Sequence, residues 1–180
     1  KGYTPSVFSM LPSLVERAGL LVGGGSITGI YTVLVEGDDM TDPVADAGRS
    51  LLDGHIVLSR AQADRGHFPA IDMPGSLSRL MPSVVSGEQR EAVTRLRAHL
   101  ATLAGADDLI QIGAYKAGSN PEVDQAIAQR SSIESFLRQR VDETASYEDA
   151  LAGLMASLTP NAPTAPNVPT TPTANGPQTT

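Results

Sequence analysis

Residues 26–60 read SITGIYTVLVEGDDMTDPVADAGRSLLDGHIVLSR, and this stretch carries the clearest alternation of strand and helix signals in the chain. Residues 26–35 are rich in β-branched side chains and apolar on both faces, which is typical of a buried strand in a parallel sheet. Asp42 suits the N-cap of the helix that follows, with a proline directly after it. A second short strand is expected over 55–59 and a brief helix over 60–66. Strand, helix, strand and helix at this spacing predict an α/β fold with a parallel sheet.

Beyond residue 82 the sequence predicts helix after helix. Ser86 with Gln89, and Ser146 with Asp149, have the spacing of capping boxes, and Asn120 stands where another helix would begin. Apolar side chains recur at helical spacing after each of these starts. We expect them to form the core: Val93, Leu96, Leu100, Leu103, Val123, Ile127, Leu137, Leu151, Leu154, Met155 and Leu158.

These patterns divide the chain into three parts. Residues 1–82 mix strand and helix signals, and residues 83–158 would be an all-α domain. Residues 159–180 read TPNAPTAPNVPTTPTANGPQTT, without a charge or an aromatic ring. Such a segment cannot bury enough apolar surface to offset the entropy of ordering it, so we expect a disordered tail.

Composition limits the classes of function. The chain has 180 residues, 41% of them hydrophobic, with a formal net charge of −7 and no cysteine. The negative charge and the lack of a basic patch argue against nucleic-acid binding, and thiolate metal sites and disulfides are impossible. No apolar run reaches the roughly 18 residues that a membrane span needs. Because the chain begins at Lys1 rather than at a methionine, we expect upstream residues to be missing.

An acidic cluster follows the expected strand at 26–35. It consists of Asp38, Asp39, Asp42 and Asp46. Acids at the carboxyl end of a buried strand hold magnesium in nucleoside triphosphatases, so the cluster has the appearance of a Walker B site. Helix capping together with solvated charge explains the same residues equally well. The spacing of a calcium-binding loop is not met.

A second candidate is Arg79, in the segment MPGSLSRLMP at residues 73–82. Proline and glycine on both sides of this arginine predict a loop. The ordinary role of a loop arginine is a surface ion pair. The lysines are Lys1 and Lys116, and neither lies in a G-x-x-x-x-G-K-[ST] motif, so these residues contain no P-loop.

Five segments in a fixed order carry a resemblance to a known family. They read KGYTPSVFSMLPSLVERAG, GSITGIYTVLVEGDDMTDPVADAGRSLLDGHIVLSR, RGHFPAID, SLSRLM and DLIQIGAYKAGSNPEVDQAI. Together, over residues 1–158, they resemble the C-terminal part of the flagellum-specific ATPases, which serve flagellar type III protein export. That family is related to the catalytic subunit of F-type ATP synthase. The resemblance implies the C-terminal portion of a RecA-like nucleotide-binding domain over 1–82, followed by the helical C-terminal domain.

The resemblance assigns roles to single residues. Arg79, in the S-x-S-R motif, would be an arginine finger that reaches the γ-phosphate bound by a neighbouring protomer. Phe68 would stack on the adenine ring, and Val141 and Tyr147 align near further adenine-facing positions. Asp38, Asp39, Thr41 and Asp42 would form a rim that faces a central stalk, and this replaces the magnesium interpretation of the cluster. No metal ligand is assigned within the chain.

The implied activity is ATP hydrolysis with Mg²⁺, by a ring that energises protein export. The resemblance implies a homo-oligomer, a hexamer, with central-stalk and stator-like proteins, export substrates and chaperones as partners. It also implies a cytoplasmic location, peripheral at the inner face of the bacterial cell membrane. The P-loop would lie upstream of Lys1, so we expect these residues to be inactive alone. Alternatives are a virulence type III secretion ATPase and a non-catalytic interaction protein without the motor. A rotary synthase subunit is disfavoured by the segment at 110–124, which suits the secretion branch better.

Overall fold

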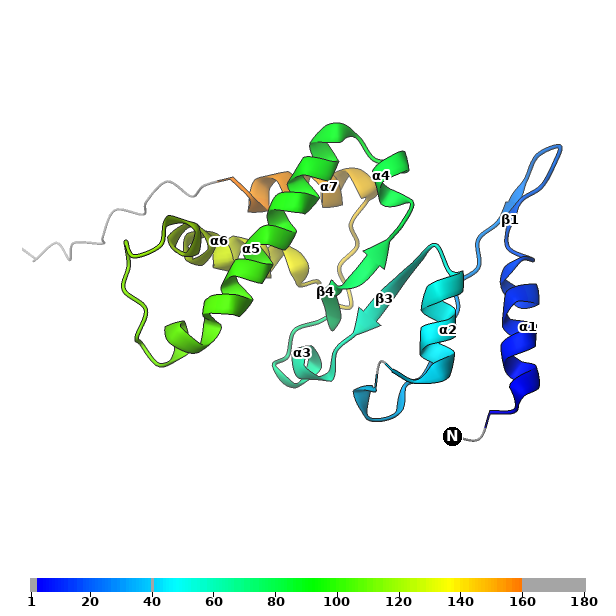
Figure 1. Ribbon diagram of the computed structural model, residues 1–180. Coiled ribbons are helices and arrows are strands. Elements are labelled where there is room, and N and C mark those ends of the chain that lie inside the picture. Colours follow the sequence, from blue (N-terminus) through cyan, green and yellow to red (C-terminus); the bar gives the residue numbers. More distant parts are fainter. Residues whose placement is uncertain (1–2, 40, 160–180) are drawn as a thin grey trace, which may run out of the picture.

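The computed structural model describes residues 3–39 and 41–159, arranged as a small strand pair between two sets of helices (Figure 1). On one side lie α1 and α2, and on the other lie the long helices α5, α6 and α7. The elements are α1 Pro5–Val15, β1 Gly19–Leu20, β2 Ser26–Ile27, η1 Glu36–Asp38, α2 Pro43–Leu51, β3 Gly54–Leu58, α3 Arg60–Asp64, β4 Ile71–Ser78, α4 Met81–Val84, α5 Gly87–Gln111, α6 Pro121–Leu137 and α7 Tyr147–Ser157.

The expected helix starts are confirmed by their caps. The Asp42 carboxylate accepts from the first turn of α2, Asn120 does the same for α6, and Ser86 accepts from Gln89 at the start of α5. At α7 both halves of the capping box with Ser146 are present. These signals are reliable because a cap lies two or three residues from the amides that it satisfies.

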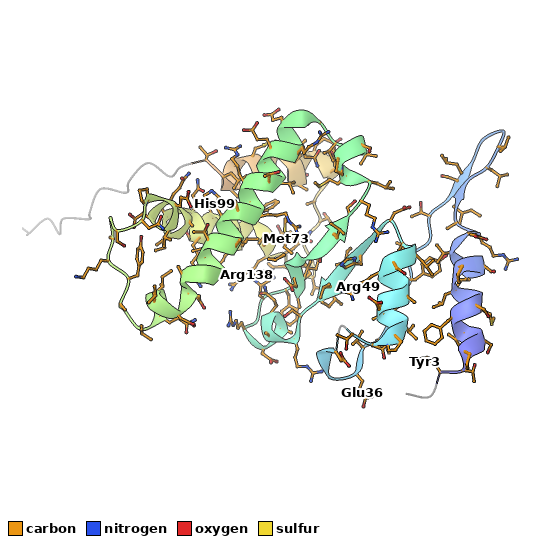
Figure 2. All side chains as sticks on the ribbon, viewed as in Figure 1. Tyr3, Glu36, Arg49, Met73, His99 and Arg138 are labelled. Atoms are coloured by element: carbon orange, nitrogen blue, oxygen red, sulfur yellow. The ribbon has the colours of Figure 1, made fainter. Side chains whose placement is uncertain are left out.

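The buried core lies where the expected apolar stripes of α5, α6 and α7 meet. Its centre is a cluster of five side chains: Ala92, Leu96, Ile133, Leu154 and Leu158. Met73 of β4 packs against this cluster (Figure 2). The helical region and the strand pair therefore share a packed contact, and a domain boundary at residue 82 stays a prediction.

The strand expected at 26–35 is wrong for most of its length. Only Ser26–Ile27 is a strand, paired with β1, and the residues from 28 to 35 belong to no helix or strand. Ile30 is 92% exposed and Leu34 is 87% exposed. A segment that is apolar on both faces becomes a strand only where neighbours pair with it and cover it, and within the described residues nothing does so.

The arginine segment also differs from the expected loop. Residues 71–78 form β4, which pairs antiparallel with β3, and the chain turns only at Arg79 before α4. Both strand pairs in the described part of the chain are antiparallel, so the parallel sheet of an α/β nucleotide-binding domain is not built from pairings within it. The disorder expected after residue 159 lies outside the described residues.

Candidate functional site

Arg79 lies at the end of β4, and its guanidinium group caps the C-terminus of α2. Nη1 donates to the carbonyls of Ser50 at 3.2 Å and Leu52 at 3.3 Å, and Nη2 donates to that of Arg49 at 3.0 Å. Its backbone amide donates to Asp53 O at 2.8 Å. The last carbonyls of a helix lack intrahelical partners and carry partial negative charge, so a cation is favourable there. All three acceptors of the guanidinium are neutral main-chain carbonyls, so none of them neutralises its positive charge.

Phe68 lies on the wall of an open cavity of about 850 Å³. The rest of the wall comes mainly from the end of α6 and the segment after it. The lining residues are Gly66, Phe68, Ser131, Glu134, Ser135, Arg138, Gln139, Arg140, Val141, Asp142 and Glu143. The ring of Phe68 is 54% exposed, which leaves an aromatic face free to contact a ligand.

Two hydrogen bonds join the walls of this cavity across the fold. The amide of Gln139 donates to the carbonyl of Phe68 at 2.9 Å. Arg138 Nε donates to Nδ1 of the buried His67 at 3.4 Å. Phe68 is thus positioned by residues some 70 places further along the chain, as the separation of 71 in the second bond shows.

The charges of the cavity favour a neutral planar group over a phosphate. Three carboxylates, Glu134, Asp142 and Glu143, line it together with two guanidinium groups, Arg138 and Arg140. Arg140 Nε donates to Asp142 at 2.9 Å, which lowers the pKa of Asp142 and raises that of Arg140. Because Arg140 is already paired, the cavity offers little net positive charge to an anion, while the Phe68 ring offers a stacking surface.

The acidic segment before α2 makes local contacts. Asp39 Oδ1 accepts from both the amide and the hydroxyl of Thr41. The buried Asp42 accepts from the amides of Val44 at 2.9 Å and Ala45 at 3.3 Å. Asp38 is the last residue of η1. Within residues 3–39 and 41–159, no three His, Asp or Glu side chains are grouped as metal ligands would be. In the same described part, no helix is long and apolar enough to cross a membrane.

Comparison with known proteins decides what kind of fold carries these sites. The ATP synthase alpha/beta family model, for the nucleotide-binding domain, matches residues 1–78, and the model of the EscN ATPase C-terminal domain of type III secretion matches residues 85–156. A flagellum-specific ATP synthase of Pseudomonas aeruginosa is 52% identical over 159 residues, which are 88% of this chain and 35% of that protein. Over most of its length the chain is a homologue of flagellar and type III secretion ATPases, at about half identity.

Further ATPases of type III secretion are similar to the same extent. A type 3 secretion system ATPase of Sinorhizobium fredii is 51% identical over 88% of this chain and 35% of its own length. The assembled ATPase EscN of enteropathogenic E. coli superposes with a TM-score of 0.83 at 46% identity, over 88% of this chain and 38% of that one. EscN in complex with its central stalk EscO gives 0.77 at 44%, over 88% and 37%. The chain spans about a third of the length of the curated relatives that it matches.

The structure brings together some of the residues that the family resemblance singles out. Phe68 and Val141 line the same cavity, and Val141 is fully exposed there. Tyr147, the first residue of α7, is not among the lining residues, and its hydroxyl donates to Gln89 Oε1 at 2.7 Å. Arg79 does not line this cavity either.

Sequence reasoning missed the residues that hold these groups in place. His67, Arg138 and Gln139 position Phe68, and Arg79 caps α2 in addition to any role toward a ligand. The spacing of residues in the sequence does not predict these contacts, because each contact joins distant segments and several have a backbone carbonyl as acceptor. Pairing the motif residues with positions far along the chain requires the fold.

Proposed function

We propose that these residues form the C-terminal part of a ring-forming ATPase whose ATP hydrolysis drives protein export by a flagellar or related type III system. The homology supports this, together with one observation that carries it. An exposed aromatic ring, Phe68, lines an open cavity between the segment matched to the nucleotide-binding domain and the segment matched to the C-terminal domain. A cavity at such a junction is a common place for a ligand.

In this proposal the adenine ring occupies the Phe68 cavity. A phenyl face stacks on a base without any hydrogen-bonding group, and such stacking contributes about 1–3 kcal/mol for each base. Val141 lines the same cavity and would add apolar contact. Tyr147 would act only after moving from its bond to Gln89. The triphosphate and Mg²⁺ would be held by residues outside this chain.

Arg79 is the proposed arginine finger, acting on the γ-phosphate bound by the neighbouring protomer. Its guanidinium is exposed and bonded to neutral carbonyls. An anionic phosphate offers the guanidinium Coulomb attraction and bidentate hydrogen bonding that neutral carbonyls do not, so a phosphate would displace them. The positive charge then stabilises the negative charge that spreads over the phosphoryl group in the transition state.

The assembly and partners follow from the relatives. EscN is described as an assembled ATPase and in complex with a central stalk. By analogy we assign this chain to a homo-oligomer, a hexamer, at the cytoplasmic face of the membrane, with stator-like proteins, export substrates and chaperones as partners. Asp38, Asp39, Thr41 and Asp42 are proposed to face the stalk. A virulence export ATPase is the second candidate, because the identity of 51% to the type 3 secretion system ATPase of Sinorhizobium is almost the same as the 52% to the flagellar protein.

A mixing experiment tests the finger and the motor together. The complete reading frame is expressed as two variants, Arg79→Ala and one that lacks the P-loop lysine. Each alone should assemble and lose about 10³-fold or more in turnover. Mixed before assembly, they should regain activity at about a quarter of the interfaces, where an intact P-loop meets an intact Arg79.

Two results would contradict the proposal. A mixture as inactive as either variant would exclude action across the subunit boundary. A complete reading frame without any G-x-x-x-x-G-K-[ST] segment would leave no site to hydrolyse ATP, and the non-catalytic interaction protein would become the better assignment.

A further inference from the structure

Arg97, on the face of α5 that packs toward the core, makes a multiple contact with the backbone of β4. Its Nη1 donates to the carbonyls of Met73 at 3.3 Å and Ser76 at 3.2 Å. Its Nη2 donates to those of Pro74 at 2.9 Å and Ser76 at 3.3 Å. The side chain is half-buried. Met73, labelled in Figure 2 between α5 and the strands, also packs on the helical core.

The carbonyls that Arg97 contacts belong to an irregularity in β4. Asp72 pairs with Val57 and Leu77 pairs with His55, so β4 has four residues, 73–76, where β3 has one. An expanded strand segment of this kind loses its ladder partners. Arg97 supplies donors for the carbonyls of 73, 74 and 76, and His55 Nε2 lies 3.1 Å from the carbonyl of Gly75.

Regular pairing resumes immediately after this bulge and leads to Arg79. Leu77 and Ser78 pair with His55 and Gly54, and the Arg79 amide donates to Asp53 O at 2.8 Å. Two residues therefore separate the last carbonyl held by Arg97 from the arginine at the end of the strand. Within that span β4 is paired with β3, so a displacement of the bulge also displaces the residues that follow it.

We propose that Arg97 is a positioning residue for Arg79, which couples the position of α5 to that of the guanidinium at the end of β4. The proposal rests on the proposed function of Arg79. The planar fork of arginine, with its five donors, is needed to bridge three carbonyls at once, and a lysine ammonium in the same place reaches fewer of them. A movement of the helical region is transmitted through Arg97 to the bulge, and through Leu77 and Ser78 to Arg79.

A double-mutant cycle in the complete, assembled protein tests this coupling. Arg97→Ala should lower kcat about 10- to 100-fold with little change in KM, which is the size expected when a catalytic group is misplaced by about 1 Å. In the Arg79→Ala background the same substitution should change kcat less than about 2-fold, because no guanidinium remains to be misplaced. The kcat of Arg97→Lys should lie between that of the parent protein and that of Arg97→Ala. Arg95→Ala, an exposed arginine of the same helix, is the matched control and should leave kcat unchanged.

The outcomes separate this inference from the proposed function. If Arg97→Ala lowers kcat equally in both backgrounds, or leaves it unchanged in the parent, the positioning role is wrong while the finger stands. If Arg79→Ala itself leaves kcat unchanged, the finger is wrong. Hydrogen exchange on the 180-residue chain gives a readout that does not depend on activity. Arg97→Ala should speed exchange of the Leu77 and Arg79 amides while Arg95→Ala does not, and equal exchange in both variants would overturn the coupling.

Discussion

Arg79→Ala separates the two things that this side chain does. In the structure the guanidinium donates three hydrogen bonds, of 3.0, 3.2 and 3.3 Å, to the carbonyls at the end of α2. The group is exposed, so each bond contributes at the lower end of the usual range of about 0.5–1.5 kcal/mol. The cation at the helix C-terminus adds about 0.3–1 kcal/mol. We therefore expect Arg79→Ala to lower the free energy of unfolding by about 2 kcal/mol.

The effect on turnover should be far larger. Loss of an arginine finger costs about 10³–10⁵ in rate, which corresponds to about 4–7 kcal/mol in the activation free energy. Loss of stability cannot produce this effect. A domain with about 5 kcal/mol of stability that loses about 2 kcal/mol still keeps more than about 99% of its molecules folded. A thousand-fold loss in an assembled ring must therefore come from the chemistry at the γ-phosphate.

Urea unfolding of the 180-residue chain, followed by far-UV circular dichroism, measures the first effect, and steady-state hydrolysis by the complete protein measures the second. Arg79→Lys keeps a cation at the end of α2 but loses the fork, so it should recover about half of the stability and little of the rate. Arg65→Ala removes an exposed arginine after α3 and serves as the control. A rate loss of less than about 10-fold alongside the expected loss of stability would refute the finger and leave Arg79 as a helix cap.

Substitutions at three further positions test the site and its surroundings. Phe68→Ala should raise the Kd for ATP of the complete protein about 5- to 150-fold, measured by fluorescent-nucleotide titration, with little change in Tm because the ring is 54% exposed; Phe68→Tyr should bind normally. Asp42→Ala should lower stability by about 1 kcal/mol while Asp42→Ser restores it, and a stalk contact would show as lost stalk binding in both. Burial, and then the charge of Arg95, lower the pKa of His99 from its ordinary value of 6.5. The contribution of His99 to the stability of the fold is therefore complete above pH 6.5, where His99 is neutral, and is lost as the pH falls below that value. His99→Gln should reduce the fall in Tm below pH 6.5.

The helical half of the fold could be predicted because its signals are local. Ser86, Asn120 and Ser146 each cap amides two or three residues away, and the apolar stripes of α5 and α7 meet in the core at Leu96, Leu154 and Leu158. In α6 the expectation was wrong in one position, because Ile127 is 37% exposed and Ile133 is the buried residue. The strand expected at 26–35 could not be judged in this way. Its apolar side chains favour a strand only if they are buried, and this burial depends on neighbouring strands and helices that the segment itself does not specify.

The site was predictable only in part, for a related physical reason. Arg79 and Phe68 lie in short motifs and could be singled out from the sequence. The groups that hold them could not, because their partners are distant or are main-chain atoms. Arg97 lies 24 residues from Met73, whose carbonyl it contacts, and a carbonyl has no side-chain identity to read. Pro74 and Gly75 predict a turn by their residue types, but inside β4 they form a bulge. Arg97 of α5 donates a hydrogen bond to the carbonyl of Pro74 in this bulge.

The junction across which the Phe68 cavity lies has a consequence for how such a chain can evolve. Residues 79–84 fall between the two family matches, and a recombination there would inherit one wall of the cavity from each parent. The bond from the Gln139 amide to the Phe68 carbonyl uses only main-chain atoms and would survive any such cross. The contact between Arg138 and His67 needs both side chains, so it would persist only when both parents carry the same pair. Selection on the cavity therefore acts on two distant segments as one inherited unit, while the chain between them is held by other contacts, those of Arg79 and Arg97 among them.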